Sequence, residues 1–204
     1  MSHLISSPAR LEAFSDGVIA VIITIMVLEL KIPHDDGLIG LRAVLPVLGV
    51  YALSFTFTGV YWINHHHLVH RTDEADQAIL YANLAFLFSL SLLPFFTSYL
   101  LEKQINSFSV ILYIVALMAV GFTFMLLRLA IGRRLRSKNA LEQEDQAAIF
   151  KHWSSLAIYL IAIPLALYRA YWSLGLVVLV MAIWIYPTAN VRPKHSANHD
   201  HPGM

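Results

Sequence analysis

The chain has 204 residues, of which 58% are hydrophobic and only 13% are charged, and its formal net charge is +1. Soluble domains are about 45–50% apolar and about 25% charged, so this composition predicts an integral membrane protein. The almost neutral charge argues against nucleic acid as a partner. Because the chain has no cysteine, disulfides, thiolate metal sites and a cysteine nucleophile are excluded.

Six apolar stretches separated by polar connections predict six transmembrane helices. We expect these helices at residues 11–30, 38–63, 77–100, 108–131, 152–168 and 171–186. The predicted organisation is a cytosolic N-terminus over 1–10, a six-span transmembrane domain over 11–187 and a disordered cytosolic tail over 188–204. No small-residue cleavage site follows Leu30, so the first span is expected to be retained rather than removed as a signal peptide.

The distribution of Lys and Arg predicts how these spans are oriented. Six spans place both ends of the chain on one side of the membrane. The connections on that side hold most of the basic residues, including the run RRLRSK over 133–138. By the positive-inside rule both termini are expected in the cytosol, with the chain in the plasma membrane.

The first span is unusual because it carries charged groups. Arg10, Glu12 and Asp16 lie at its entrance and Glu29 lies at its exit, with Thr24 in its middle. An acid at the centre of a membrane helix costs about 2.5–3.5 kcal/mol on insertion scales, and less near the ends. A helix that served only as an anchor would not need these groups, so the first span is predicted to be the functional element.

Two stripes run along the first span at helical spacing. The first is a stripe of small residues (Ala13, Gly17, Ala20, Thr24) and the second is a stripe of bulky apolar residues (Phe14, Val21, Ile25, Leu28). If several copies of this helix surrounded one axis, apolar rings and a ring of threonine hydroxyls would form, and pores and filters are built from such parts. From spacing alone ordinary helix packing is the simpler explanation, so pore lining stays a hypothesis. Arg10, Ser15 and Asp16 are equally open to two interpretations, an interfacial helix cap or a functional polar network.

Two motifs resemble a known family of ion channels. The pattern R-x-x-x-F-S-D-G (Arg10, Phe14, Ser15, Asp16, Gly17), followed by an apolar run with a threonine and then L-E-L, resembles the first helix of the transmembrane protein 175 family. That family comprises lysosomal potassium channels and shorter bacterial homologues. The segment Trp62-Ile63-Asn64-His65-His66, followed by Asn83 and Pro94-Phe95, is similar to the family's second and third helices. Only the first hundred residues carry the resemblance, and the single six-span unit resembles the bacterial form, which assembles as a tetramer around its first helix.

The resemblance implies a role for each matched residue. Val21 corresponds to the narrowest apolar constriction of the pore, Ile25 and Leu28 to further rings, and Thr24 to a threonine layer linked to potassium preference. The signature that holds the pore helix consists of Arg10, Phe14, Ser15 and Asp16, and its expected partners are Trp62, Asn64, His65, His66 and Asn83. The narrowest ring of the family is usually isoleucine or leucine, so the smaller Val21 implies a wider neck. The potassium-filter sequence T-V-G-Y-G is absent from the chain, so any selectivity must come from side chains.

The predicted function is a potassium-selective or potassium-preferring channel with passive conduction. It is expected to be an all-α homotetramer in the lipid bilayer, with potassium as the permeant ion and no cofactor. The alternative is a proton- or cation-coupled secondary transporter that uses Asp16 and the cluster His65–His70, although no paired repeat of broken helices is visible. A structural or regulatory membrane protein is a third option. A metal site at the histidines is less favoured than a structural role, and the sequence contains no common enzyme motif.

Overall fold

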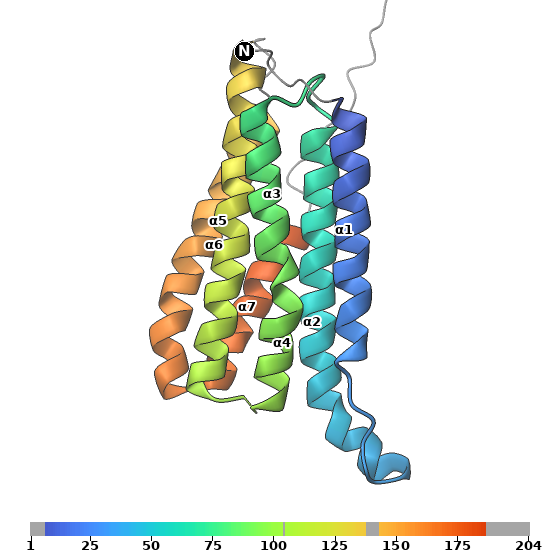
Figure 1. The fold of residues 1–204 in the computed structure, drawn as a ribbon. Helices are drawn as coiled ribbons and strands as arrows, with labels where there is room; N and C mark the ends of the chain where they lie inside the picture. The colour runs from blue at the N-terminus through green and yellow to red at the C-terminus, as the bar shows by residue number, and fades with distance from the viewer. Residues whose placement is uncertain (1–6, 104, 138–142, 187–204) are drawn as a thin grey trace, which may run out of the picture.

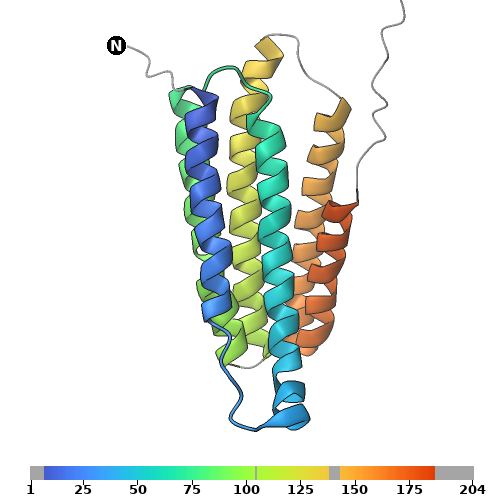
Figure 2. The same cartoon turned by 90° about the vertical axis from the view of Figure 1, so that its right-hand side faces the viewer.

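The computed structural model describes residues 7–103, 105–137 and 143–186, and in this part of the chain every regular element is an α-helix. The helices lie side by side in one elongated bundle (Figures 1 and 2). Their bounds are α1 Pro8–Leu28, α2 Gly37–Val69, α3 Gln77–Ser91, α4 Leu93–Glu102, α5 Ser107–Ser137, α6 Gln143–Tyr168 and α7 Ala170–Ile185. The predicted disordered tail over 188–204 lies outside the described residues.

Five segments of the described chain are long and apolar enough to cross a membrane. They are α1, α2, the pair α3–α4 taken together as Gln77–Glu102, most of α5 and most of α6. The sixth, α7, has 16 residues, which gives it a length of about 24 Å against a hydrocarbon core of about 30 Å. The predicted all-helical membrane architecture is therefore confirmed, with five full-length spans and one short apolar helix in place of six full-length spans.

The third predicted span is not one continuous helix. It breaks at Leu92, and α4 begins at Leu93 with Pro94 in its first turn. Proline has no backbone N–H and its ring obstructs the preceding turn, so a helix that reaches it must break or kink. The sequence shows the proline but not whether the helix merely bends around it.

The second helix extends beyond the end that its polar residues predict. The sequence predicts that the helix ends near Ile63 and that the histidines lie in a polar connection, whereas α2 continues to Val69 and includes His65, His66 and His67. Likewise α6 begins at Gln143 rather than near His152. A helix satisfies its own backbone groups whether its side chains are polar or apolar. Polar side chains therefore indicate where a helix leaves the hydrocarbon but not where the helix ends.

The core of the bundle surrounds α5. Tyr113, Leu117, Phe124 and Leu127 of this helix are fully buried, and α5 packs against α3, α4, α6 and α7. The first helix packs instead against α2, α3 and α4. As a result α1 and α6 lie on opposite sides of the bundle (Figures 1 and 2).

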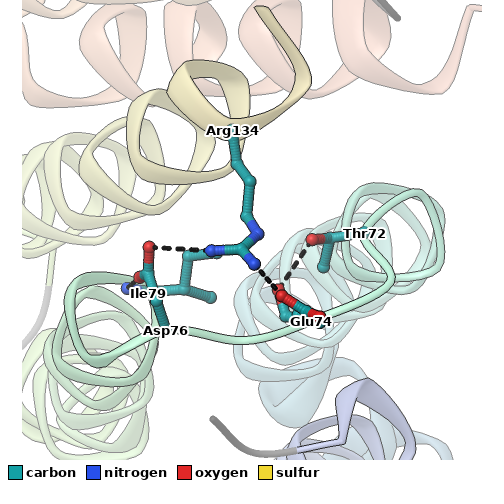
Figure 3. Close-up of polar contacts among 5 residues, drawn as sticks. All are labelled: Thr72, Glu74, Asp76, Ile79 and Arg134. Atoms are coloured by element: carbon teal, nitrogen blue, oxygen red, sulfur yellow. Dashed lines mark hydrogen bonds and ion pairs between the residues drawn. The ribbon is translucent and has the colours of Figure 1, made fainter. Parts of the chain in front are cut away.

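The connection between α2 and α3 is held against the end of α5 by a cluster of polar groups (Figure 3). Arg134 of α5 pairs with Glu74, and its Nη1 atom lies 3.5 Å from Asp76 Oδ2. Asp76 in turn caps α3 by accepting a hydrogen bond from the backbone N–H of Ile79 at 2.9 Å, and the Thr72 hydroxyl donates to the carbonyl of Glu74. One guanidinium thus fixes both the turn and the start of α3.

Candidate functional site

The first helix has one buried face and one exposed face. It begins at Pro8, which suits a first helical turn because its missing N–H would have no helical partner there. The buried residues are Leu11, Ser15, Ile19, Ile22 and Met26, and their spacing of three or four places them on one side of the helix. The packing of this side leaves the opposite side of α1 facing away from the subunit.

A buried chain of hydrogen bonds joins α1 to α3 and α2. Asn83 Nδ2 of α3 donates to Ser15 Oγ of α1 at 2.9 Å, and Asn83 Oδ1 lies 2.7 Å from His65 Nε2 of α2. Ser15 and His65 are completely buried and Asn83 is 1% exposed. Because an amide oxygen can only accept, His65 carries a proton on Nε2. Buried hydrogen bonds between helices favour one arrangement of the helices that they join, so this chain sets the rotation of α1.

Two further pairs join α1 to α2 nearer the surface. Trp62 Nε1 donates to Asp16 Oδ1 at 2.8 Å, and His66 Nδ1 lies 2.6 Å from Glu12 Oε1. The acids are four residues apart on α1 and their partners are four residues apart on the antiparallel α2, so the two pairs form consecutive rungs between the helices. Glu12 is not among the site residues predicted from the sequence. The matching spacing of the two acids and of Trp62 with His66 is the signal that could have found it.

The structure divides the predicted signature and its expected partners. Two residues of the signature, Ser15 and Asp16, take part in the contacts between α1 and the helices α2 and α3. The expected partners found in the same group of contacts are Trp62, His65, His66 and Asn83. Arg10 and Phe14 lie on the exposed side of α1, where Phe14 is 57% exposed. Asn64 donates to the carbonyl of Val60 in its own helix at 2.8 Å, a bond that holds no other helix.

The residues predicted to line a pore all lie on the exposed side of α1. Val21, Ile25 and Leu28 are 54%, 41% and 79% exposed in the single subunit. The Thr24 hydroxyl is exposed and lies 3.0 Å from the carbonyl oxygens of both Ala20 and Val21. Since its proton points to the helix backbone, a lone pair of the hydroxyl oxygen remains directed outward.

A large groove of about 980 Å³ runs beside this exposed side, between α1 and the α3–α4 segment. Its walls are mostly apolar and include Phe14, Val21 and Ile25 from α1, and Pro94, Phe95 and Tyr99 from α4. Glu29 and Glu102 also line it. Lys31 Nζ donates to Glu102 Oε1 at 2.5 Å, and this hydrogen bond and charge raise the pKa of Lys31.

The described residues offer little for metal chemistry at this site. Among them, no group of three or more histidine, aspartate or glutamate side chains is arranged to hold a metal ion. His65 contacts Asn83 and His66 contacts Glu12, and the structural role of these histidines stays a prediction.

Comparisons with known proteins agree with this geometry. A family model described as the endosomal/lysosomal potassium channel TMEM175 matches residues 10–94. A protein from Chryseobacterium sp. (strain P1-3), described as a potassium channel, is 36% identical over 189 residues, which cover 93% of this chain and 98% of that protein. A protein from zebrafish (Danio rerio), described as the endosomal/lysosomal proton channel TMEM175, is 29% identical over 120 residues, or 56% of this chain and 23% of that protein.

The fold is similar to that of a solved channel. The crystal structure of a lysosomal potassium-selective channel TMEM175 homolog from Chamaesiphon minutus superimposes with a TM-score of 0.74 and 29% identity, covering 86% of this chain and 95% of that one. The matched family region contains α1 from Arg10 onward, together with the residues of α2 and α3 that hold it. The chain therefore belongs to the TMEM175 family, a family of ion channels rather than enzymes, and has the length of its bacterial relatives.

Proposed function

We propose that the chain is a potassium-preferring cation channel in which four subunits surround a pore lined by α1. The observation that carries the proposal is the division of α1 into two faces. The polar side chains that hold α1 to α2 and α3, among them Ser15 and Asp16, lie on the packed side. Val21, Thr24 and Ile25 face away from the subunit.

The exposed face has the composition of a narrow ion pathway. Rings of Val21, Ile25 and Leu28 would form apolar constrictions that open and close by wetting and drying. Between the first two rings, Thr24 would supply oxygen atoms that replace part of the hydration shell of potassium. The small residues Ala13, Gly17 and Ala20 on the same side allow neighbouring copies of α1 to approach closely.

The groove beside α1 supports an assembly of subunits. Its apolar walls and its position next to the proposed pore lining make it the surface that a neighbouring subunit would cover. In this arrangement both termini lie in the cytosol and the channel spans the plasma membrane, with potassium as the permeant ion and no cofactor.

Recordings from purified protein in planar bilayers test this proposal. With a potassium gradient across the bilayer and sodium as the competing cation, we expect resolved single-channel steps whose reversal potential follows potassium. A saturating flux without unitary steps, driven by an imposed proton gradient, would instead identify the transporter that uses Asp16 and the His65–His70 cluster.

Proton conduction is a second candidate because the zebrafish relative is described as a proton channel. In the described structure, however, the carboxylate of Asp16 bonds to Trp62, and His65 bonds to Asn83 within the packed interior. These groups hold α1 rather than line its exposed face. Under symmetrical potassium and a pH gradient, a reversal potential at zero supports the potassium channel, and a shift toward the proton equilibrium potential supports proton conduction.

A further inference from the structure

A second cavity, of about 350 Å³, lies between α5 and α6. This volume falls within the range of ligand pockets, roughly 300–1,000 Å³. Six residues of α5 and six of α6 form its walls, and Tyr61 of α2 and Trp184 of α7 form its floor. The cavity lies on the side of the bundle that carries α6, away from α1 (Figures 1 and 2).

The walls of this cavity suit a hydrocarbon chain. Met118, Met125 and Leu156 line it, and its outer edge is formed by Phe122 and Trp153, which are 65% and 62% exposed. Methionine adapts its shape to irregular apolar partners. The edge residues belong to α5 and α6 within segments long and apolar enough to cross a membrane, so the cavity opens toward the lipid of the bilayer.

Two of the polar side chains in the wall bond to protein partners, whereas Tyr159 Oη and His152 Nδ1 are buried without a partner among the described residues. His152 Nε2 lies 2.6 Å from the carbonyl oxygen of Gly121, and Trp184 Nε1 donates to Ser155 Oγ at 2.9 Å. Gly121 leaves room for this arrangement, because a Cβ atom there would lie 3.3 Å from Tyr61 Oη. What the cavity offers to an occupant is therefore mostly apolar surface.

A positive charge lies at one end of the cavity. Phe122, Leu126, Leu129 and Arg133 follow one another at intervals of three or four along α5, so Arg133 lies on the same face one turn beyond the cavity wall. Arg133 is exposed, and no acidic side chain pairs with it among the residues that the structure describes. A guanidinium beside an acyl-chain cavity matches the phosphate of a lipid headgroup.

The short helix α7 ends at the level of the cavity wall formed by Gly121 and His152. It ends at Ile185, roughly 6 Å short of the thickness of a bilayer core. Lys151 of α6 donates to the carbonyl of Tyr186 just after this end at 2.5 Å, and its ammonium lies 6.0 Å from the centre of the Trp184 ring. Lysine and tryptophan side chains at the end of a span are typical of the membrane interface, where lipid headgroups lie. Lys151, Trp153 and Trp184 form such a group here.

We propose that the α5–α6 cavity binds an anionic phospholipid, with an acyl chain between Phe122 and Trp153 and the phosphate at Arg133. The outward orientation of this face rests on the proposed function, because it places α1 at the axis and α6 at the periphery. The test below measures lipid contact and not conduction, so its result is separate from that of the ion-flux experiment.

Fluorescence quenching by brominated lipids tests the proposal on the full-length protein in phosphatidylcholine liposomes. A small fraction of the lipid is replaced either by phosphatidylglycerol or by phosphatidylcholine with brominated acyl chains. The difference in fluorescence between the wild type and Trp153→Phe gives the contribution of Trp153, at the edge of the cavity. The difference between the wild type and Trp172→Phe gives the contribution of Trp172, which lies outside the cavity and is 71% exposed. We expect severalfold stronger quenching of Trp153 by brominated phosphatidylglycerol than by brominated phosphatidylcholine, and equal quenching of Trp172 by the two lipids.

Matched variants identify the two parts of the site. Arg133→Gln should abolish the preference of Trp153 for the anionic lipid, whereas Arg169→Gln at the opposite end of α6 should leave it intact. Leu126→Phe, which fills the cavity, should weaken the quenching, whereas Leu160→Phe on the exposed side of α6 outside the cavity should not.

Two results overturn the proposal. Equal quenching of Trp153 by both lipids would mean that only ordinary surrounding lipid reaches the cavity. No quenching of Trp153 by either lipid would mean that protein, such as another subunit, covers this face. Elution of every variant at the volume of the wild type confirms that a lost preference is not a lost fold.

Discussion

At the scale of single residues, one amide determines how the candidate pore helix is held. Asn83 bonds at the same time to Ser15 of α1 and His65 of α2, and all three side chains are buried. A buried donor or acceptor left without a partner costs about 1–3 kcal/mol. Removing the amide therefore affects two helices through one substitution.

Asn83→Leu should lower the stability of the purified protein by about 1–3 kcal/mol, because it leaves His65 Nε2 without its partner and removes the bond from α3 to Ser15, which keeps only its bond to the Leu11 carbonyl. Thermal unfolding in detergent measures the effect. Asn64→Leu is the matched control, since Asn64 bonds only to its own helix, and it should lower the unfolding temperature much less. Equal losses in the two variants would show that the chain through Asn83 does not hold α1.

Thr24→Ala should reduce the preference for potassium over sodium about two- to tenfold, if the lost oxygen contributes about 0.5–1.5 kcal/mol to ion coordination. Reversal potentials in mixed potassium and sodium solutions measure the ratio. Thr123→Ala is the control, because Thr123 has the same pair of backbone contacts within α5. An unchanged ratio in Thr24→Ala would remove the hydroxyl from the selectivity mechanism.

At the scale of the helix, the rungs between α1 and α2 and the buried chain to α3 together decide which side of α1 faces outward. Glu12 and Asp16 contact α2 on one flank of the helix, while Val21 and Ile25 remain exposed on the other. The function of the outward side depends on this rotation. Val27, which lies on a different side of the same helix, therefore serves as a direct comparison for Val21.

Val21→Ala should raise the single-channel conductance severalfold, because a smaller side chain widens the proposed neck and eases its wetting. Val27→Ala is the control, since Val27 is also exposed, at 46%, but is turned by about 120° around the helix. Single-channel recordings compare the two variants. If both leave the conductance at the wild-type value, the ring of Val21 is not the constriction.

The same scale applies to the polar cluster that fixes α3. Arg134→Gln should destabilise the protein by up to about 1 kcal/mol, because exposed or partly exposed ion pairs contribute no more than that. The effect should shrink at high salt, since salt screens such pairs. Arg133→Gln next to it should change the unfolding temperature little. If the loss of stability in Arg134→Gln does not change with salt, Arg134 stabilises the protein through packing and not through its charge.

At the scale of the whole molecule, the proposed pore exists only between subunits. A single subunit exposes the outward side of α1 and the groove of about 980 Å³ beside it, and both require other copies to cover them. The α5–α6 face lies on the opposite side of the bundle (Figure 1). This arrangement predicts close contact between copies of α1 and none between copies of α5.

Cysteine crosslinking measures that contact without interference, because the natural chain contains no cysteine. Under mild oxidation Val21→Cys should form covalent dimers on a denaturing gel, whereas Phe122→Cys on the α5 face should remain monomeric. Two cysteines can bond only when their Cα atoms approach within about 7 Å. The reverse pattern of bands would place α5, and not α1, at the subunit interface.

Much of the architecture was predictable from residue order alone, because it depends on local composition. Long apolar stretches must form helices in a membrane, where no water is present to satisfy the backbone, and the motif around Ser15 and Asp16 carried the family resemblance. The break at Leu92 and the extension of α2 to Val69 were not predictable in the same way. A proline permits a bend or a break, and polar residues mark the membrane surface rather than a helix end.

The sequence by itself determined that the chain is an all-helical membrane protein and which helix carries the family signature. It also determined which residues share a side of that helix. The tertiary structure decided which of those residues face the packed interior, since rotation about the helix axis is set by contacts with residues far along the chain. Asn83 and Trp62 supply those contacts for Ser15 and Asp16. Helical spacing places residues on one side of a cylinder, but only packing against other helices decides which way that side points.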